Sequence, residues 1–378
     1  MRAFVFTDEA LARHAGRFVW LELNTDVPGN ALFLEKYPVE NWPTLFIIDP
    51  REEKALVRFA GSATVPQLER LFEDGERAYR GVAQGPEGLL ARGDALYGEG
   101  KAAESADVLV QALAEAPADW SRRGRALESL LVAQYGAKRY EACARAALAE
   151  LPRVPPSPSW ANAAALGLTC ALQVPDETSG AKELRASLEE KAREALSPSI
   201  TMPVDDRSGV YDVLVQARQA AKDEAGAKAL AGQWLSFLEG EAARAPTPEA
   251  RTVFDSHRIA SAMVLGDLMR VVPALEQSER DLPDDYNPPA RLANLYRRLG
   301  RLDDALAAST RALAKVQGGR RLRVLSDRAD IHLARGERDA AVRTLEDALA
   351  YAKTLSEAQA SPRQVAALEK KLADVKAK

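Results

Sequence analysis

The chain has 378 residues, of which 47% are hydrophobic and 28% are charged, and its formal net charge is -4 at pH 7. This composition is typical of a folded, core-forming protein and excludes a chain that is disordered throughout. The near balance of 51 basic and 55 acidic residues gives no general affinity for nucleic acid, which requires an excess of positive charge. No apolar run reaches the roughly 18 residues that a membrane-spanning helix needs.

The composition of the chain changes near residue 83. Eleven of the 23 aromatic residues lie in residues 1–83, whereas the remainder of the chain is rich in Ala and Leu. Aromatic and β-branched residues favour strands, and Ala and Leu favour helices. We therefore expect a mixed α/β domain over residues 1–83 and an all-α domain over residues 84–378, joined near Gly81, Gly85 and Pro86.

The first domain is predicted to alternate between helices and strands. Residues 1–11 are predicted to be helical, and Asp8 and Glu9 interrupt any apolar core of a signal peptide. The hydrophobic run over residues 17–24 predicts a buried strand. The next predicted elements, in chain order, are a helix over residues 30–37, strands over residues 44–48 and 55–59, and an amphipathic helix over residues 65–79.

The order and spacing of these elements resemble the thioredoxin family. The resemblance rests on residues 21–26 and 34–46, which look like that family's middle strand, second helix and cis-proline strand. In the family, a proline followed by threonine opens the strand that faces the active site. The resemblance therefore implies a cis bond between Trp42 and Pro43, and a substrate-binding surface formed by Trp42, Pro43 and Thr44. The alternative for Trp42 is an ordinary core aromatic residue.

The reactive part of the thioredoxin family does not occur in this sequence. Thiol exchange of that type requires a Cys-x-x-Cys pair at a helix N-terminus, where the pKa of the attacking thiol is lowered. Cys143 and Cys170 are 27 residues apart, so no catalytic residue is predicted. We expect two buried core cysteines, with one structural disulfide as the alternative. Residues 1–6 resemble the portion that follows the redox motif, and one hypothesis is that the chain begins just after it.

Residues 84–378 contain a helical repeat. Gly300 and Gly336 are 36 residues apart, and the same spacing separates Ala305 from Ala341. An earlier copy includes Gly100, whereas the spacing drifts between residues 150 and 285. This period resembles the tetratricopeptide repeat, in which pairs of antiparallel helices stack into a solenoid. The resemblance implies an all-α scaffold that binds a protein or peptide partner.

The first helix of each predicted pair would line the concave side of such a solenoid. Four polar residues at helical spacing are candidates for a protein-binding groove there, with solvated surface side chains as the alternative: Arg291, Asn294, Arg297 and Arg298. Acidic pairs such as Asp205 and Asp206 stand at predicted loops or helix starts. Carboxylates stabilise helix N-termini, so capping is favoured over catalysis for these pairs.

Two functions agree with these patterns. The first is a redox-inactive thioredoxin-like domain joined to a tetratricopeptide-type scaffold that binds protein. The alternative is a thiol–disulfide oxidoreductase whose Cys-x-x-Cys pair lies upstream and whose helical arm recruits substrate proteins. The three histidines are far apart, so neither a metal site nor a cofactor is expected.

Two further expectations concern the location of the chain and its self-association. The sequence as written predicts a cytoplasmic protein, and a periplasmic or exported protein is the alternative if an upstream export signal is missing. An incomplete thioredoxin unit would leave an open sheet edge. Such an edge can pair with another chain and produce an oligomer.

Overall fold

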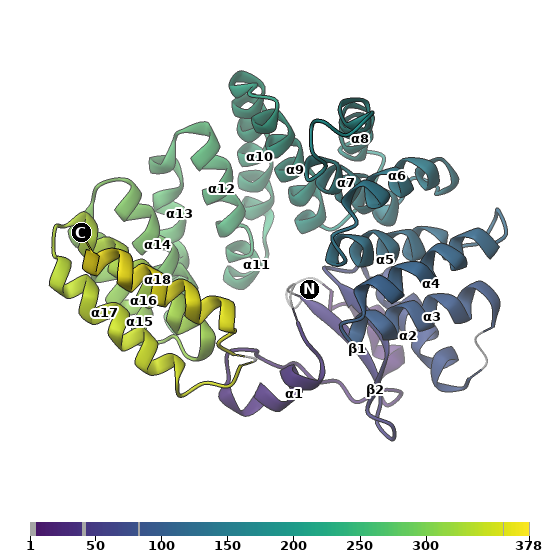
Figure 1. Cartoon of the computed structure of the whole chain (residues 1–378), viewed down its shortest axis with the longest axis horizontal. Helices are drawn as coiled ribbons and strands as arrows, with labels where there is room; N and C mark the ends of the chain where they lie inside the picture. The colour runs from purple at the N-terminus through teal and green to yellow at the C-terminus, as the bar shows by residue number, and fades with distance from the viewer. Residues whose placement is uncertain (1–4, 40–42, 82–83, 358, 378) are drawn as a thin grey trace. The chain divides into compact units, whose positions relative to one another are not determined.

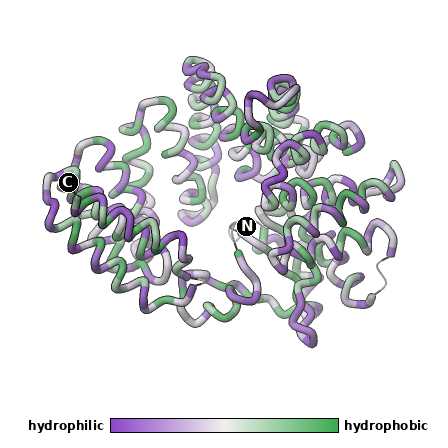
Figure 2. Tube along the Cα trace, in the orientation of Figure 1, coloured by the Kyte–Doolittle hydropathy of each residue, from purple (hydrophilic) through white to green (hydrophobic). Residues whose placement is uncertain are grey.

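The computed structural model of the chain describes residues 5–39, 43–81, 84–357 and 359–377 (Figure 1). The chain divides into two compact units: unit 1 comprises Met1–Arg17 and Tyr37–Ser236, and unit 2 comprises Phe18–Lys36 and Phe237–Lys378. Hydrophobic and hydrophilic stretches alternate along the helices (Figure 2), as expected where one helix face is buried. Among the described residues, no helix combines the length and the apolar character required to cross a membrane.

Unit 1 contains a small sheet near its start. After the 3-10 helix η1 (Glu9–His14) come the antiparallel strands β1 (Thr44–Asp49) and β2 (Lys54–Ala60) and the helix α2 (Val65–Tyr79). α2 begins where the sequence predicts because Thr64 and Gln67 form a capping box, in which each side chain accepts a hydrogen bond from the other's backbone N–H. The predictions of two strands and one helix over this segment are confirmed.

The strand predicted over residues 17–24 is wrong. Residues 18–24 form no strand, and they belong to unit 2 together with η2 (Pro28–Asn30) and α1 (Ala31–Lys36). Val19 and Leu21 are 88% and 75% exposed. Apolar residues favour a strand only where neighbouring strands bury them, and none does so here. A sheet of two strands in the described residues does not establish the thioredoxin-like fold that the resemblance implies.

Helices α3 to α9 of unit 1 pack as successive antiparallel pairs (Figure 1). The pairs are α3 (Gly85–Gly98) with α4 (Ala102–Glu115), α5 (Arg123–Gly136) with α6 (Tyr140–Glu150) and α7 (Pro158–Leu172) with α8 (Ala181–Ala195), followed by α9 (Val204–Ala220); the short η3 (Leu151–Arg153) follows α6. The first helices also contact one another, α3 with α5, α5 with α7, and α7 with α9. Contacts between neighbouring repeats are the defining feature of a solenoid.

Glycine allows two helix pairs to approach closely. A Cβ atom added at Gly93 would lie 2.6 Å from Cγ of Leu109, and one added at Gly167 would lie 2.5 Å from Cβ of Ala147. Leu109 and Ala147 are fully buried, so neither neighbour can move toward solvent. Packing between α3 and α4, and between α6 and α7, therefore requires glycine at these two positions.

A disulfide joins α6 to α7. Cys143 and Cys170 are both fully buried, and their Cα atoms are 6.0 Å apart. The two cysteines are therefore core residues, as predicted, and they also form the structural disulfide that was the alternative. A cross-link of this kind stabilises the fold mainly by restricting the unfolded chain.

Unit 2 continues the helical pattern. α10 (Glu224–Arg244) spans the division between the units, and unit 2 then contains α11 (Pro248–Thr252), α12 (Asp255–Leu265), η4 (Leu268–Val271), α13 (Val272–Asp281), α14 (Asn287–Arg298), α15 (Leu302–Leu313), α16 (Gly318–Ala334), α17 (Arg338–Ala352) and α18 (Pro362–Ala377). α14 pairs with α15, α16 pairs with α17, and α18 packs against α17. The predicted repeat copies around Gly300 and Gly336 are confirmed.

The corner inside each helix pair holds one residue with positive φ. These residues recur 34 to 44 positions apart, and they are Gly100, Lys138, Gly180, Lys222, Gly266, Gly300 and Gly336. The structural repeat thus continues through residues 150–285, where its spacing is longer and lysine replaces glycine at one corner. These two differences explain why the sequence pattern weakens there.

Replacing lysine by glycine at a corner with positive φ is expected to stabilise the protein. A non-glycine residue in the left-handed region costs about 1–2 kcal/mol, so Lys222→Gly is expected to raise the free energy of unfolding by about 1 kcal/mol. Urea unfolding followed by circular dichroism measures the change. The control is Lys228→Gly in the exposed interior of α10, which is expected to destabilise by about 1 kcal/mol. Equal destabilisation by both variants would contradict the left-handed backbone conformation of Lys222.

Candidate functional site

The first helices of unit 1 enclose a cavity of about 340 Å³. Side chains from α3, α5, α7 and α9 line it, together with residues at the end of β2. We call this cavity the polar pocket because six charged side chains line it: Asp94, Glu128, Asp205, Asp206, Arg58 and Arg125. Charged side chains are seldom buried in a helical core unless they are paired or functional, so each requires a physical explanation.

An ion pair between α3 and α5 occupies one part of the polar pocket. Oδ2 of Asp94 lies 2.6 Å from Nη2 of Arg125, and Oδ1 accepts a hydrogen bond of 3.2 Å from the Ser129 hydroxyl. Burial raises the pKa of Asp94 to about 6, although the Arg125 guanidinium lowers it. Arg125 also donates to the carbonyl oxygen of Arg58 at 3.3 Å, which ties the end of β2 to the helices.

A second group of carboxylates has neutral partners. The buried Glu128 accepts hydrogen bonds from the Ser159 hydroxyl at 2.6 Å and from the Asn162 amide at 2.9 Å. The same amide nitrogen donates to Oδ2 of Asp206 at 3.1 Å. Asn162 on α7 therefore bridges an acid on α5 and an acid on α9, and its two amide hydrogens serve one carboxylate each.

Burial dominates the electrostatics of these acids. It raises the pKa of Glu128, although the hydrogen bonds from Ser159 and Asn162 and the positive charges of Arg125 and Arg70 oppose the change. Burial also raises the pKa of Asp206 to about 7, and the negative charges of Glu128 and Asp205 add to the effect. Within the described residues, Oδ1 of Asp205 is a buried atom without a hydrogen-bond partner. This end of the polar pocket therefore concentrates negative charge.

The other walls of the polar pocket are apolar or aromatic. Val132 and Leu166 line it on α5 and α7, and Phe59 and Tyr97 line it near β2. The guanidinium of Arg58 lies 4.3 Å from the centre of the Tyr97 ring, a cation–π distance. Apolar walls with a few convergent polar groups are the usual composition of a binding site.

The sequence prediction missed most of these residues, although a periodic signal exists. On α5 the lining residues Arg125, Glu128, Ser129 and Val132 follow the spacing i, i+3, i+4, i+7, and the lining residues Asn162, Ala165, Leu166 and Thr169 on α7 do the same. This spacing places them on one helix face. Asp205 and Asp206 do lie in the first turn of α9, as predicted, yet Asp206 also reaches Asn162 across the polar pocket.

The substrate-binding surface predicted from the thioredoxin resemblance lies partly outside the described residues. Trp42 is not among them. Pro43 is exposed and its carbonyl oxygen accepts a hydrogen bond of 2.8 Å from the Gly61 backbone N–H, and Thr44 is the first residue of β1. Neither residue lines the polar pocket, and their role in substrate binding stays a prediction.

The predicted groove residues of α14 have separate surroundings. Arg291 lies 3.9 Å from the fully buried Asp255, to which it supplies a compensating charge. Asn294 accepts a hydrogen bond of 3.0 Å from the exposed Arg298, one turn away on the same helix. Arg297 is half-buried, and its positive charge lowers the pKa of Asp327, although burial raises that pKa more strongly. The charge contact with Asp255 gives Arg291 a structural role. Binding of a partner by these four residues stays a prediction.

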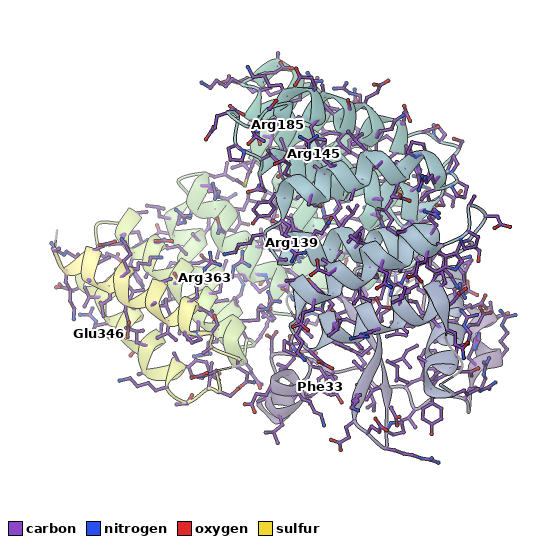
Figure 3. All side chains as sticks on the ribbon, turned by 45° about the vertical axis from the view of Figure 1, so that its right-hand side comes forward. Phe33, Arg139, Arg145, Arg185, Glu346 and Arg363 are labelled. Atoms are coloured by element: carbon purple, nitrogen blue, oxygen red, sulfur yellow. A yellow bond between two sulfur atoms is a disulfide. The ribbon has the colours of Figure 1, made fainter. Side chains whose placement is uncertain are left out.

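Arginines on the second helices of unit 1 form internal contacts. Arg139, Arg145 and Arg185 lie on or beside α6 and α8 (Figure 3). Arg145 forms an ion pair with Glu141, and Arg185 donates to the carbonyl oxygen of Ala171 at 3.0 Å. These positive charges hold neighbouring turns together. Among the described residues, no group of three His, Cys, Asp or Glu side chains is arranged to hold a metal ion.

Comparison with known proteins identifies one part of the chain. Residues 286–354, which include α14, α15, α16 and α17, match a family model described as "Tetratricopeptide repeat". This part of the chain is therefore a tetratricopeptide repeat region, as the sequence predicts. No curated protein matches the chain.

Three solved structures whose descriptions name the tetratricopeptide repeat or a TPR domain show a partial similarity to this chain. One from Parabacteroides merdae has a TM-score of 0.48 and 13% identity, and the alignment covers 77% of this chain and 98% of that one. One from Thermus thermophilus has a TM-score of 0.27 and 17% identity, with coverage of 78% and 100%. The TPR2AB domain of yeast Sti1, in a complex with a pHSP90 partner, has a TM-score of 0.29 and 14% identity, with coverage of 76% and 98%.

The raised pKa of Asp206 predicts that protein stability falls as the pH rises. Between about pH 4 and pH 7 the unfolded chain ionises this carboxyl while the folded protein keeps it protonated, so the penalty grows and is complete above pH 7. Asp206→Asn removes this penalty and still accepts the hydrogen bond from Asn162. We expect its gain in unfolding free energy to be about 1–3 kcal/mol larger at pH 8 than at pH 4.

Urea unfolding at the two pH values measures this difference. The matched control is Asp212→Asn, which changes an acid of the same helix that accepts a hydrogen bond from Gln216 one turn away. The control variant is expected to show no such pH-dependent gain. An Asp206→Asn protein that is destabilised at pH 8 would contradict the assignment of a buried charge.

Proposed function

We propose that the chain is a scaffold that binds a polypeptide partner, and that the polar pocket of unit 1 forms part of the binding surface. The observation that carries the proposal is a cavity built by the first helices of successive repeats, with polar side chains from four helices converging on it. Repeat proteins present such continuous surfaces to extended ligands. The tetratricopeptide repeat region at residues 286–354 supports the same class of function.

The alternative function, thiol–disulfide exchange, has no support in the described residues. The chain has two cysteines, and they are buried and bonded to each other, so neither is a free thiol. Exchange requires an accessible thiolate. The thioredoxin resemblance of residues 1–83 remains a prediction, and so does oligomer formation through a sheet edge.

The disulfide bears on the compartment of the protein. Stable disulfides are rare in the cytosol, where thioredoxin and glutathione keep thiols reduced, and they persist in the periplasm and outside the cell. The Cys143–Cys170 bond therefore favours the exported alternative over the cytoplasmic one. We propose that the chain works in an oxidising compartment.

Selection of random peptides displayed on phage, with the full-length chain as bait, tests the proposed binding function. We expect enriched peptides whose affinity falls at least about tenfold in Gly209→Leu. Gly209 lines the polar pocket and has open space at its Cβ position, so leucine adds an apolar side chain at the wall of the cavity. A change of this size corresponds to about 1.4 kcal/mol.

The matched control for this selection is Gly240→Leu, which adds the same side chain to α10, where the Cβ atom would meet only the Arg244 side chain at 3.7 Å. The control variant is expected to bind like the wild type. The proposal is wrong if no peptide is enriched, or if Gly209→Leu binds the selected peptides with unchanged affinity.

The compartment proposal predicts the state of the two cysteines in native cells. Cells are lysed directly into denaturant with a maleimide-linked polyethylene glycol, which adds mass to each free thiol. We expect no mass shift without reductant, and a shift for two thiols when a reductant is added first. A fully shifted band without reductant would place the chain in a reducing compartment.

A further inference from the structure

The charges that line the polar pocket do not balance. Four carboxylates and two guanidiniums line it. Arg125 is committed to Asp94 on the neighbouring helix. Arg58 lies against the Tyr97 ring, and its Nη2 donates to the carbonyl oxygen of Pro38 at 3.5 Å. Negative charge is therefore in excess at the end formed by α5, α7 and α9.

The carboxylates of Glu128 and Asp206 carry this excess. Their hydrogen-bond donors, Ser159 and Asn162, are neutral. In the part of the chain that the structure describes, neither carboxylate has a basic nitrogen within 4.0 Å, the distance that defines an ion pair. Neutral donors satisfy hydrogen bonds but do not cancel charge. The positive charges of Arg125 and Arg70 lower the pKa of Glu128, but burial raises it more strongly, and a buried ion without a direct ion-pair partner is unfavourable. A cation that entered the cavity would remove this cost.

The shape of the cavity selects among cations. Val132 and Leu166 line the same cavity as the acids with apolar side chains, and about 340 Å³ is room for a long side chain. Lysine and arginine have an aliphatic stem that packs on apolar walls and a charged end that forms hydrogen bonds. A metal ion suits the site less well, because among the residues that the structure describes the acids are not arranged as a group of three or more metal ligands.

We propose that the polar pocket binds the side chain of a lysine or arginine residue in the partner polypeptide, with its cationic group at the carboxylates of Glu128 and Asp206. This inference rests on the proposed function, because it names the chemistry by which that surface recognises its partner. The cationic group replaces the missing counter-ion, and the stem lies along Val132 and Leu166. Asn162 acts as a positioning residue that holds the two carboxylates in place.

Binding of fixed-residue peptide pools to the full-length chain tests the inference. Each pool contains short acetylated and amidated peptides with one fixed central residue, which is lysine, arginine, norleucine, citrulline or glutamate, and with random flanking positions. Norleucine and citrulline keep the shapes of lysine and arginine without their charge. We expect the lysine or the arginine pool to bind at least about tenfold more tightly than its neutral counterpart and the glutamate pool.

Two double variants assign this preference to the polar pocket. Glu128→Gln with Asp206→Asn keeps the shape of both side chains and removes their charge, so the preference for a basic residue is expected to disappear. The control is Glu115→Gln with Asp212→Asn, which removes two surface acids of α4 and α9 and is expected to keep the preference. Circular dichroism confirms that each variant is folded.

Three outcomes would overturn the inference. If all pools bind equally, the scaffold binds peptides without a cation pocket, and the proposed function stands while the inference fails. If no pool binds, both fail. If free cadaverine or lysine amide displaces bound peptide at the same concentration as a lysine peptide, the site recognises a small amine, and a polypeptide side chain is the wrong source of the cation.

Discussion

Close packing between helices is the constraint on which the rest of unit 1 depends. One helix pair cannot bury its apolar face alone, so each pair must stack on the next. Packing is tight where glycine meets a buried side chain, within one pair at Gly93 beside Leu109 and between successive pairs at Gly167 beside Ala147. Because the pairs are close, the first helices α3, α5, α7 and α9 contact one another in order. Residues more than 100 positions apart in the sequence can then line one cavity.

Stacking also explains why the polar pocket holds unbalanced charge. The hydrogen bonds of Asn162 join acids from two different helices, and the apolar contacts of the stack hold those helices in place. A few buried carboxylates cost stability, but a large apolar core can offset that cost. Such local conflicts with folding stability are common at functional sites. The unbalanced charge of the polar pocket is the feature on which the proposed binding function rests.

The sequence predicts the elements of this protein better than it predicts their arrangement. β1, β2 and α2 follow from local patterns and from the capping residues Thr64 and Gln67. The strand expected over residues 17–24 fails because it requires partners that the sequence does not reveal. The repeats around Gly300 and Gly336 are visible, whereas those near Lys222 are hidden by longer spacing and a non-glycine corner. The polar pocket is missed because its acids look like helix-capping or surface residues until four helices are placed together.

Titration of the side-chain carboxyl groups by carbon-13 NMR tests the central claim most directly. The account predicts that one aspartate carboxyl titrates near pH 7, and that this signal is absent in Asp206→Asn. It also predicts that adding a peptide that binds through a lysine residue lowers this apparent pKa, because the ammonium group stabilises the carboxylate. If every carboxyl group of the folded protein titrates below about pH 5, the polar pocket holds no buried, uncompensated charge, and the account is contradicted.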